Sequence, residues 1–242
     1  HLAGLAHSHQ YTLEDYQSIN VDGTLRLANE AVKAGVKRFV FVSSIGVNGI
    51  STSNKAFNIK SIVDPHNAYA LSKYNAELGL KKIADDTGLE VVIVRPTLVY
   101  GPNAPGNFGK LVKLVEKLPV LPFGLVSNRR DFIAVQNLAD LLMCCATHPK
   151  APGNIFLASD GQAVSTKEFT NSISTGLGKV VIQVPVPIGV IRFVSRFLGK
   201  SLLFEQLFGN LEVDSSNIKH VLGWTPPLNM NQAMETLRGT RK

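Results

Sequence analysis

Two short apolar runs, separated by one long helical pattern, constrain the possible folds of this chain more than any other feature. Residues 38–44 (RFVFVSS) and 90–96 (EVVIVRP) are rich in β-branched and aromatic side chains. Between them, residues 67–87 have the spacing of a helix, which Gly88 is placed to end. Such apolar runs are typical of strands buried in a parallel sheet, and neighbouring parallel strands need a crossover connection such as a helix. The sequence therefore predicts an α/β fold.

Strand-like and helical segments alternate along the rest of the chain as well, which is typical of a doubly wound parallel sheet. Ser165 and Glu168 form a capping-box pattern at the start of one helix. Residues 184–203 have the pattern of an amphipathic helix that begins at prolines. The other expected elements are strands at 154–158 and 180–184, and helices at 15–34, 107–117, 135–148, 165–177, 214–222 and 229–237.

The character of the chain changes after Gly101, where glycine and proline become frequent and the elements become short. We therefore expect two parts. Residues 1–101 would form a sheet domain, and residues 102–242 would form mostly a smaller α/β lobe with segments that return to the first sheet.

Composition excludes several classes of protein. The net charge of the 242 residues is +7, but the basic residues are scattered and form no run of five, so we expect no binding of nucleic acid. There is no apolar stretch near 18 residues and hence no expected membrane span. Cys144 and Cys145 are adjacent in an apolar run, which favours buried thiols in a reducing, cytoplasmic setting. His7 and His9 have no further ligand at metal-binding spacing, so no metal site is expected.

Tyr69 and Lys73 are four residues apart in the helical segment, so their side chains are expected on the same side of the helix. Ser43 and Ser44 end the first apolar run, at the carboxyl edge of the expected sheet, where doubly wound sheets bind ligands. A serine hydroxyl there can hydrogen-bond a substrate oxygen. The structural alternative is a serine that caps a turn and a tyrosine that packs at a helix start. The order of strand, serine, loop and Tyr-x-x-x-Lys helix favours a catalytic group instead.

Further motifs accompany these residues: Asn20-Val-Asp-Gly-Thr, Ser43-Ser-Ile-Gly-Val-Asn-Gly, Arg95-Pro-Thr-Leu-Val-Tyr-Gly-Pro and Arg130-Asp-Phe-Ile-Ala-Val. With the Tyr-x-x-x-Lys pair, they resemble the extended short-chain dehydrogenases, and especially the NAD-dependent epimerase/dehydratase group that includes UDP-glucose 4-epimerase. The resemblance covers essentially the whole chain. It is greatest to the branch of the group that acts in bacterial polysaccharide synthesis.

The resemblance implies a Rossmann-type sheet in residues 1–101 and a nucleotide-sugar lobe in residues 102–242. It also implies a role for each matching position. The catalytic positions are Ser44, Tyr69 and Lys73. The cofactor-binding positions are Ala3, Gly4, Asn20, Ser43, Tyr69, Lys73 and Pro96, and the substrate-binding positions are Asn107 and Arg130. The implied cofactor is NAD or NADP, the implied substrate is a nucleotide sugar, and the implied assembly is a homodimer.

The implied reaction sets a condition on Tyr69, which would take the proton of a sugar hydroxyl while hydride leaves the same carbon for the nicotinamide. To do so near neutral pH, its pKa must fall from about 10 by roughly 3 units, which corresponds to about 4 kcal/mol. The ammonium of Lys73 and a positively charged nicotinamide would both lower that pKa. Ser44 would hydrogen-bond the reacting oxygen. An epimerase would return hydride to the other face of the sugar.

Two departures from the family pattern concern the cofactor. No G-x-G-x-x-G or G-x-x-G-x-x-G motif occurs, although such a loop seats the cofactor pyrophosphate in the family, and the chain begins at His1. We therefore expect a sequence that is truncated at its N-terminus and lacks the first strands of its sheet. The isolated chain is then expected to bind NAD(P) poorly, and the choice between NAD and NADP cannot be read from it.

Smaller departures concern the substrate. Ile45 and Gly46 stand where dehydratases of the family have Asp-Glu, so a 4,6-dehydratase is not expected. Asn48 and Leu98 replace a tyrosine and an asparagine of many epimerases. The sequence favours a nucleotide-sugar 4-epimerase and leaves two alternatives open. One is an NAD(P)H-dependent 4-ketoreductase of a nucleotide aminosugar, and the other is a non-enzymatic protein that binds a dinucleotide or a partner.

Overall fold

A parallel sheet of three strands lies at the centre of the computed structural model, which describes residues 1–6, 11–199 and 201–238. The strand β2 (Glu90–Pro96) pairs with β1 (Arg38–Val42) on one side and with β6 (Ile155–Ala158) on the other. The predicted strands at 38–44, 90–96 and 154–158 are therefore confirmed. Because β6 comes from the second half of the chain, that half contributes to the central sheet.

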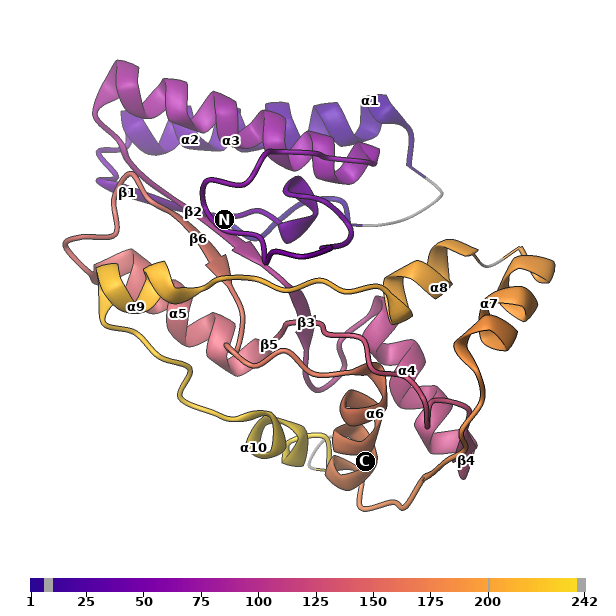
Figure 1. The fold of residues 1–242 in the computed structure, drawn as a ribbon. Coiled ribbons are helices and arrows are strands. Elements are labelled where there is room, and N and C mark those ends of the chain that lie inside the picture. The colour runs from indigo at the N-terminus through magenta and orange to yellow at the C-terminus, as the bar shows by residue number, and fades with distance from the viewer. Residues whose placement is uncertain (7–10, 200, 239–242) are drawn as a thin grey trace.

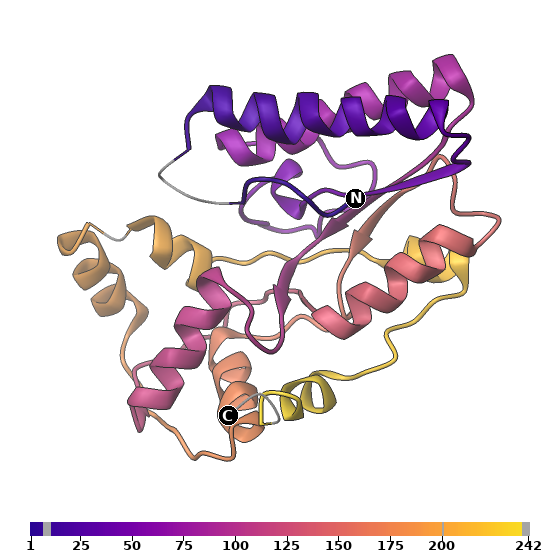
Figure 2. The same ribbon diagram turned by 180° about the vertical axis from the view of Figure 1, so that it is seen from behind.

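Helices cover both faces of this sheet (Figure 1), which confirms the doubly wound α/β fold. Alternate side chains of β2 point to opposite faces. Val91 and Ile93 pack into the cluster formed with α2 and α3, whereas Val92 and Val94 pack into the cluster formed with α5 and α9. Figure 2 shows the same layers from behind. The four helices are α2 (Gly23–Lys33), α3 (Ala68–Thr87), α5 (Val135–Thr147) and α9 (Ser216–Leu222).

The helical segment expected at 15–34 begins earlier than predicted. A capping box of Thr12 and Asp15 starts α1 (Leu13–Tyr16), a π-helical turn (Gln17–Asp22) follows, and α2 continues from it. The helix α3 is capped by Asn67, whose side chain accepts a hydrogen bond from the backbone of Ala70, and it ends at Gly88 in the left-handed conformation. These ends fix how far each helix extends over the sheet.

The second half of the chain forms a smaller group of helices and short strands. Its core is aromatic, with Phe132 and Phe169 stacked at a centroid distance of 3.8 Å. The capping box at Ser165 is confirmed. The elements are β3 (Leu98–Tyr100) paired with β5 (Phe132–Ala134), β4 (Val120–Leu121) paired with β7 (Ile182–Gln183), and helices α4 (Gly106–Lys117), α6 (Thr166–Gly176) and α10 (Met230–Glu235).

The prediction of one amphipathic helix over 184–203 is wrong. Two helices are present, α7 (Ile188–Phe197) and α8 (Ser201–Phe208). Gly199 lies between them with a φ of 65°, a left-handed conformation that commonly ends a helix. Phe197 is 84% exposed on α7 while Phe204 is buried on α8, so the phenylalanines of this region do not share one face.

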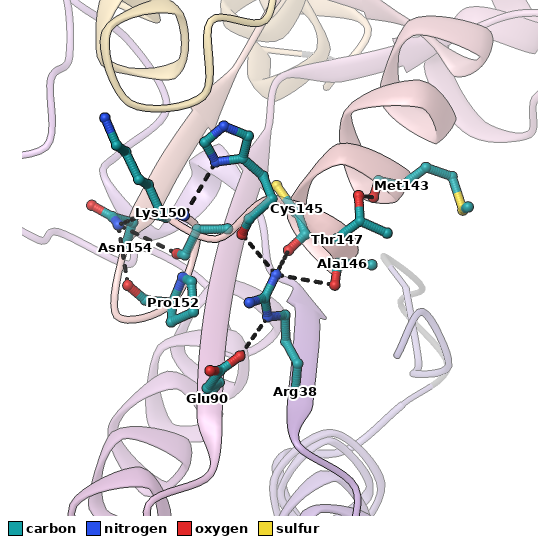
Figure 3. Close-up of polar contacts among 11 residues, drawn as sticks. Arg38, Glu90, Met143, Cys145, Ala146, Thr147, Lys150, Pro152 and Asn154 are labelled. Atoms are coloured by element: carbon teal, nitrogen blue, oxygen red, sulfur yellow. Dashed lines mark hydrogen bonds and ion pairs between the residues drawn. The ribbon is translucent and has the colours of Figure 1, made fainter.

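Arg38 connects the sheet to α5 (Figure 3). Its guanidinium donates to the carbonyls of Cys145, Ala146 and His148 at 2.8 to 3.2 Å and forms an ion pair of 2.8 Å with Glu90 on β2. Carbonyls at the end of a helix have no partner within the helix and favour a positive charge. Within the described residues, no helix combines the length and apolar character that a membrane span needs.

Candidate functional site

The carboxyl end of β1 brings the two serines to the edge of the sheet. Ser44 caps a 3₁₀ turn (Ile45–Val47), and its hydroxyl oxygen accepts a hydrogen bond of 3.1 Å from the backbone of Gly46. Tyr69 lies in the first turn of α3, directly after the Asn67 cap. The end of β1 and the start of α3 therefore bring Ser44 and Tyr69 next to each other at the edge of the sheet.

The structure brings all three predicted catalytic residues together. The side chains of Ser44 and Tyr69 are hydrogen-bonded. Lys73 follows one turn later on α3, where its ammonium donates to the carbonyl oxygen of Val42 at 3.0 Å and lies 4.8 Å from the ring centroid of Phe41. One of the three ammonium donors is thus held by the end of β1, and a ligand hydroxyl can accept from the others.

The expected low pKa of Tyr69 is not found in this structure. Burial raises the pKa, because it penalises the phenolate, and the neighbouring Tyr16 adds to this effect. The hydrogen bond from Ser44 acts in the opposite direction. The ring of Tyr16 lies edge-on to that of Tyr69 at 6.3 Å. Desolvation of the phenol therefore outweighs the hydrogen bond that lowers its pKa, and the effect of Lys73 on this pKa stays a prediction.

Lys73 is itself desolvated. Burial lowers the pKa of its ammonium to about 8, and the carboxylate of Glu77 partly opposes this shift. The lysine is therefore still largely protonated at neutral pH. Its ammonium contacts the carbonyl of Val42, at the same end of β1 as Ser44.

The predicted cofactor positions Gly4 and Asn20 lie beside Lys73. The amide of Asn20 accepts from the backbone N–H of Leu5 at 2.7 Å and donates to the carbonyl of Leu5 and to Ser72. A Cβ at Gly4 would lie 2.9 Å from Asn20 Oδ1 and 3.5 Å from Lys73 Nζ. Glycine thus keeps space open beside the ammonium, which fits a nicotinamide ribose held at this place. Asn20 holds the backbone of Leu5, the residue after Gly4. Ala3, which directly precedes Gly4, lies on an exposed segment.

Two other predicted cofactor positions are buried. Ser43 donates its hydroxyl to Glu77 at 2.5 Å and is 3% exposed, so its side chain serves the protein interior. Pro96 is buried at the end of β2, where it pairs with Ala158 of β6. Both residues are buried at the carboxyl edge of the sheet. Of the two serines, Ser44 is the one whose hydroxyl reaches Tyr69.

Arg130 and Asn107, the predicted substrate positions, both contact the region where α8 ends. Arg130 donates to the carbonyl of Gly209 at 2.8 Å, and Asn107 donates to the side chain of Gln206 at 2.9 Å. Burial lowers the pKa of Arg130 to about 10. Within the described ranges no carboxylate forms an ion pair with Arg130. A half-buried cation without an acidic partner suits an anionic ligand.

Sequence reasoning did not single out Glu77 or Tyr16. Tyr16 packs against Tyr69, and its hydroxyl donates to the carbonyl of Ala6. Glu77 lies one turn after Lys73 on α3, and this spacing of four was the available signal. Their partners lie on other elements, so no local pattern in the sequence predicts these contacts. In the part of the chain that the structure describes, no group of acidic, histidine or cysteine side chains could hold a metal, and His7 and His9 lie outside that part.

A hydrogen-bonded serine and tyrosine, with a lysine one helical turn later at the carboxyl edge of a doubly wound parallel sheet, define a nicotinamide-dependent enzyme of the short-chain dehydrogenase class. The chain belongs to the NAD dependent epimerase/dehydratase family, whose model matches residues 1–158.

Comparison with individual proteins agrees with this assignment. A UDP-glucose 4-epimerase from Vibrio cholerae is 42% identical over 222 residues, which are 91% of this chain and 68% of that protein. RMD from Pseudomonas aeruginosa, solved with NADPH, has a TM-score of 0.77 at 19% identity and covers 99% of this chain and 79% of its own. A UDP-N-acetylglucosamine 4-epimerase from Methanobrevibacter ruminantium was solved with UDP-N-acetylmuramic acid. It has a TM-score of 0.74 at 25% identity, and the match covers 99% of this chain and 74% of that one.

Proposed function

We propose that this protein is a UDP-hexose 4-epimerase in which Ser44, Tyr69 and Lys73 are catalytic residues. The observation that carries the proposal is the side-chain hydrogen bond between Ser44 and Tyr69, with Lys73 one turn away on the same helix. The 42% identity to the Vibrio cholerae UDP-glucose 4-epimerase supports the substrate class. Residues 1–101 would bind the cofactor and residues 102–242 mostly the nucleotide sugar, with Arg130 and Asn107 at its diphosphate.

The chain's own groups account for the proton transfer. Tyr69 takes the proton of the sugar hydroxyl, and Ser44 donates a hydrogen bond to the same oxygen, so that negative charge on it is stabilised. Lys73 donates to the nicotinamide ribose with the N–H groups that Val42 does not accept. The nicotinamide, when bound, supplies a reversible acceptor for the hydride. Return of the hydride to the other face of the keto sugar, together with the proton from Tyr69, would complete the epimerisation.

The raised pKa of Tyr69 has a consequence for this mechanism. Without cofactor the phenol is protonated at neutral pH, since burial dominates. A positively charged nicotinamide beside it would favour the phenolate. Tyr69 therefore becomes a base when the oxidised cofactor is in place, and the resting protein holds it as a weak acid.

An activity assay with the full-length protein tests the proposal. UDP-glucose and UDP-galactose should each convert to the same equilibrium mixture with NAD in catalytic amounts, as followed by NMR of the anomeric protons. Net consumption of NADH or NADPH, with a keto sugar required, would instead identify a 4-ketoreductase. The absence of both reactions with UDP-hexoses and UDP-N-acetylhexosamines would contradict the proposal.

We further propose that the protein is a homodimer that uses the outer surface of α1, α2 and α3. These helices lie side by side on the outside of the sheet (Figure 2). They expose large apolar side chains, and a depression of about 270 Å³ lies between α1 and α3. Exposed apolar side chains on one side of a molecule are typical of protein interfaces. With one from the π-helical turn, the side chains are Leu13, Ile19, Leu27, Leu71 and Leu78.

Changing Leu71 and Leu78 together to glutamate should convert a dimer into a monomer, because two charges would be buried in each copy of the interface. Light scattering after size-exclusion chromatography measures the mass. The control is Phe193→Glu on α7, which is also exposed but lies on the other half of the molecule. A wild-type protein that is monomeric at micromolar concentration would contradict the dimer.

A further inference from the structure

A buried ion pair joins α3, one turn after Lys73, to the end of β2. Glu77 and Arg95 are 0% and 3% exposed, and the guanidinium meets the carboxylate with two hydrogen bonds, of 2.9 Å from Nε and 2.5 Å from Nη2. Removing two charges from water is costly, and a buried pair often adds no net stability. The position of this pair therefore suggests a role other than stabilising the fold.

The other hydrogen bonds of the pair go to the segment that contains Ser44. Ser43 donates to Glu77 Oε1 at 2.5 Å, and Arg95 donates from Nη1 to Asn48 Oδ1 at 3.0 Å. Ser43 precedes Ser44 directly, and Asn48 ends the 3₁₀ turn that Ser44 caps. The segment 43–48 is thus held at both ends by one carboxylate and one guanidinium.

The other end of this network lies on the catalytic helix. Tyr69, Lys73 and Glu77 are spaced by four residues on α3, so they lie along one side of the helix. Glu77 is therefore connected to Tyr69 and Lys73 by the helix, and to Ser44 by the hydrogen bond from Ser43.

We propose that Glu77 is a positioning residue, which together with Arg95 fixes the serine segment 43–48 against the side of α3 that carries Tyr69 and Lys73. This inference rests on the proposed function only for its effect on turnover. The network keeps the hydroxyl of Ser44 within hydrogen-bond reach of Tyr69, and a change of even 1 Å between such groups can cost about a hundredfold in rate.

Glu77 also acts on Lys73 by its charge. Its carboxylate raises the pKa of Lys73, against the lowering by burial. Among the described residues, the other ionisable groups near Lys73 are Tyr69, one turn earlier on the same helix, and the α-amino group of His1, whose own pKa Lys73 lowers. Arg95 on β2 is paired with Glu77 itself. Glu77 is thus the negative charge that favours the ammonium form of Lys73.

Two variants separate geometry from charge. In Glu77→Gln the side chain can still accept from Ser43 but carries no charge, and Arg95 loses its ion-pair partner. In the double variant Glu77→Met, Arg95→Met no charge remains buried, which is often tolerated by the fold. Glu90→Gln is the matched control, because it removes the carboxylate of the half-exposed ion pair with Arg38 in the same sheet (Figure 3).

The Lys73 side chain would be titrated by ¹³C NMR in the full-length protein, with its signal identified by Lys73→Met, and exchange of the amides of residues 43–48 would be measured. We expect the Lys73 pKa to fall by about one unit in both Glu77 variants. We also expect the amides of residues 43–48 to exchange at least about tenfold faster in the double variant, because the segment opens locally. In Glu90→Gln, both the Lys73 pKa and the amide exchange should stay unchanged. If the double variant folds with an unchanged Lys73 pKa and unchanged exchange, the proposal is wrong.

The Lys73 pKa and the amide exchange can both be measured without turnover. The positioning role of Glu77 can therefore be tested even if the protein shows no epimerase activity. Where the wild type is active, kcat should fall at least about tenfold in the double variant while KM changes less than about threefold, as expected when groups that act in the transition state are displaced. A loss confined to KM would contradict positioning of the catalytic groups.

Discussion

Replacing Tyr69 with phenylalanine is expected to lower kcat for the epimerisation by about a thousandfold, because proton transfer by a positioned side chain contributes roughly 10²–10⁴ to a rate. The substitution removes one hydroxyl, which is hydrogen-bonded to Ser44, and keeps the ring that packs edge-on against Tyr16. Loss of one buried hydrogen bond should cost only about 1 kcal/mol of stability. The kinetic and structural effects are therefore separable.

Tyr74→Phe is the matched control, since Tyr74 is a half-buried tyrosine on the same helix that plays no part in the proposed site. Steady-state rates of UDP-galactose formation and thermal unfolding would be measured for both variants. A Tyr69→Phe protein with a kcat within about tenfold of wild type would show that another group moves the proton. An equal loss in both variants would point to damage to α3 in general.

The elements that the sequence predicted correctly are those whose signal is local. The strands 38–44 and 90–96 and the helix 67–87 follow from apolar runs and from residues that end helices, and these determine where Ser44, Tyr69 and Lys73 lie. A spacing of four on a helix brings two side chains together whatever the helix packs against. The geometry of the candidate catalytic group could therefore be predicted before its surroundings were known.

What the sequence did not predict depends on burial and on contacts between distant residues. The hydroxyl of Ser43, a predicted cofactor position, donates to Glu77, which is 34 residues away. Arg38 binds carbonyls more than 100 residues away. The direction of the Tyr69 pKa shift was wrong because it depends on how deeply the phenol is covered. No local pattern carries this information.

Replacing Lys73 with methionine is expected to have opposite effects on activity and stability. Activity should fall at least about a hundredfold, since the variant loses both a charge that favours the phenolate of Tyr69 and a donor to the ribose. When kcat is plotted against pH, its fall on the acidic side should move to higher pH, because the pKa of Tyr69 rises when the nearby positive charge is removed. Rates measured between pH 6 and 10 would check both points. Lys81→Met, an exposed lysine on α3, is the control and should change neither.

The effect on stability follows from the lowered pKa. In the folded protein the pKa of Lys73 is about 8, against 10.5 for a free lysine. Between these values the unfolded chain binds more protons than the folded one, so the free energy of unfolding rises with pH. The difference corresponds to at most about 3 kcal/mol. Below pH 8 the buried ammonium destabilises the fold by this full amount.

Methionine removes the desolvation penalty of the buried ammonium. It also leaves the carbonyl of Val42 without its hydrogen-bond donor, which costs about 1 kcal/mol. At pH 7 the Lys73→Met protein should therefore be about 1 to 2 kcal/mol more stable than wild type, and its unfolding free energy should lack the rise above pH 8. Urea unfolding at pH 7 and at pH 9.5 measures both quantities. A variant that is less stable at pH 7 would show that the hydrogen bond to Val42 outweighs desolvation. An inactive but more stable protein is the result expected when a buried charge is kept for catalysis at the expense of the fold.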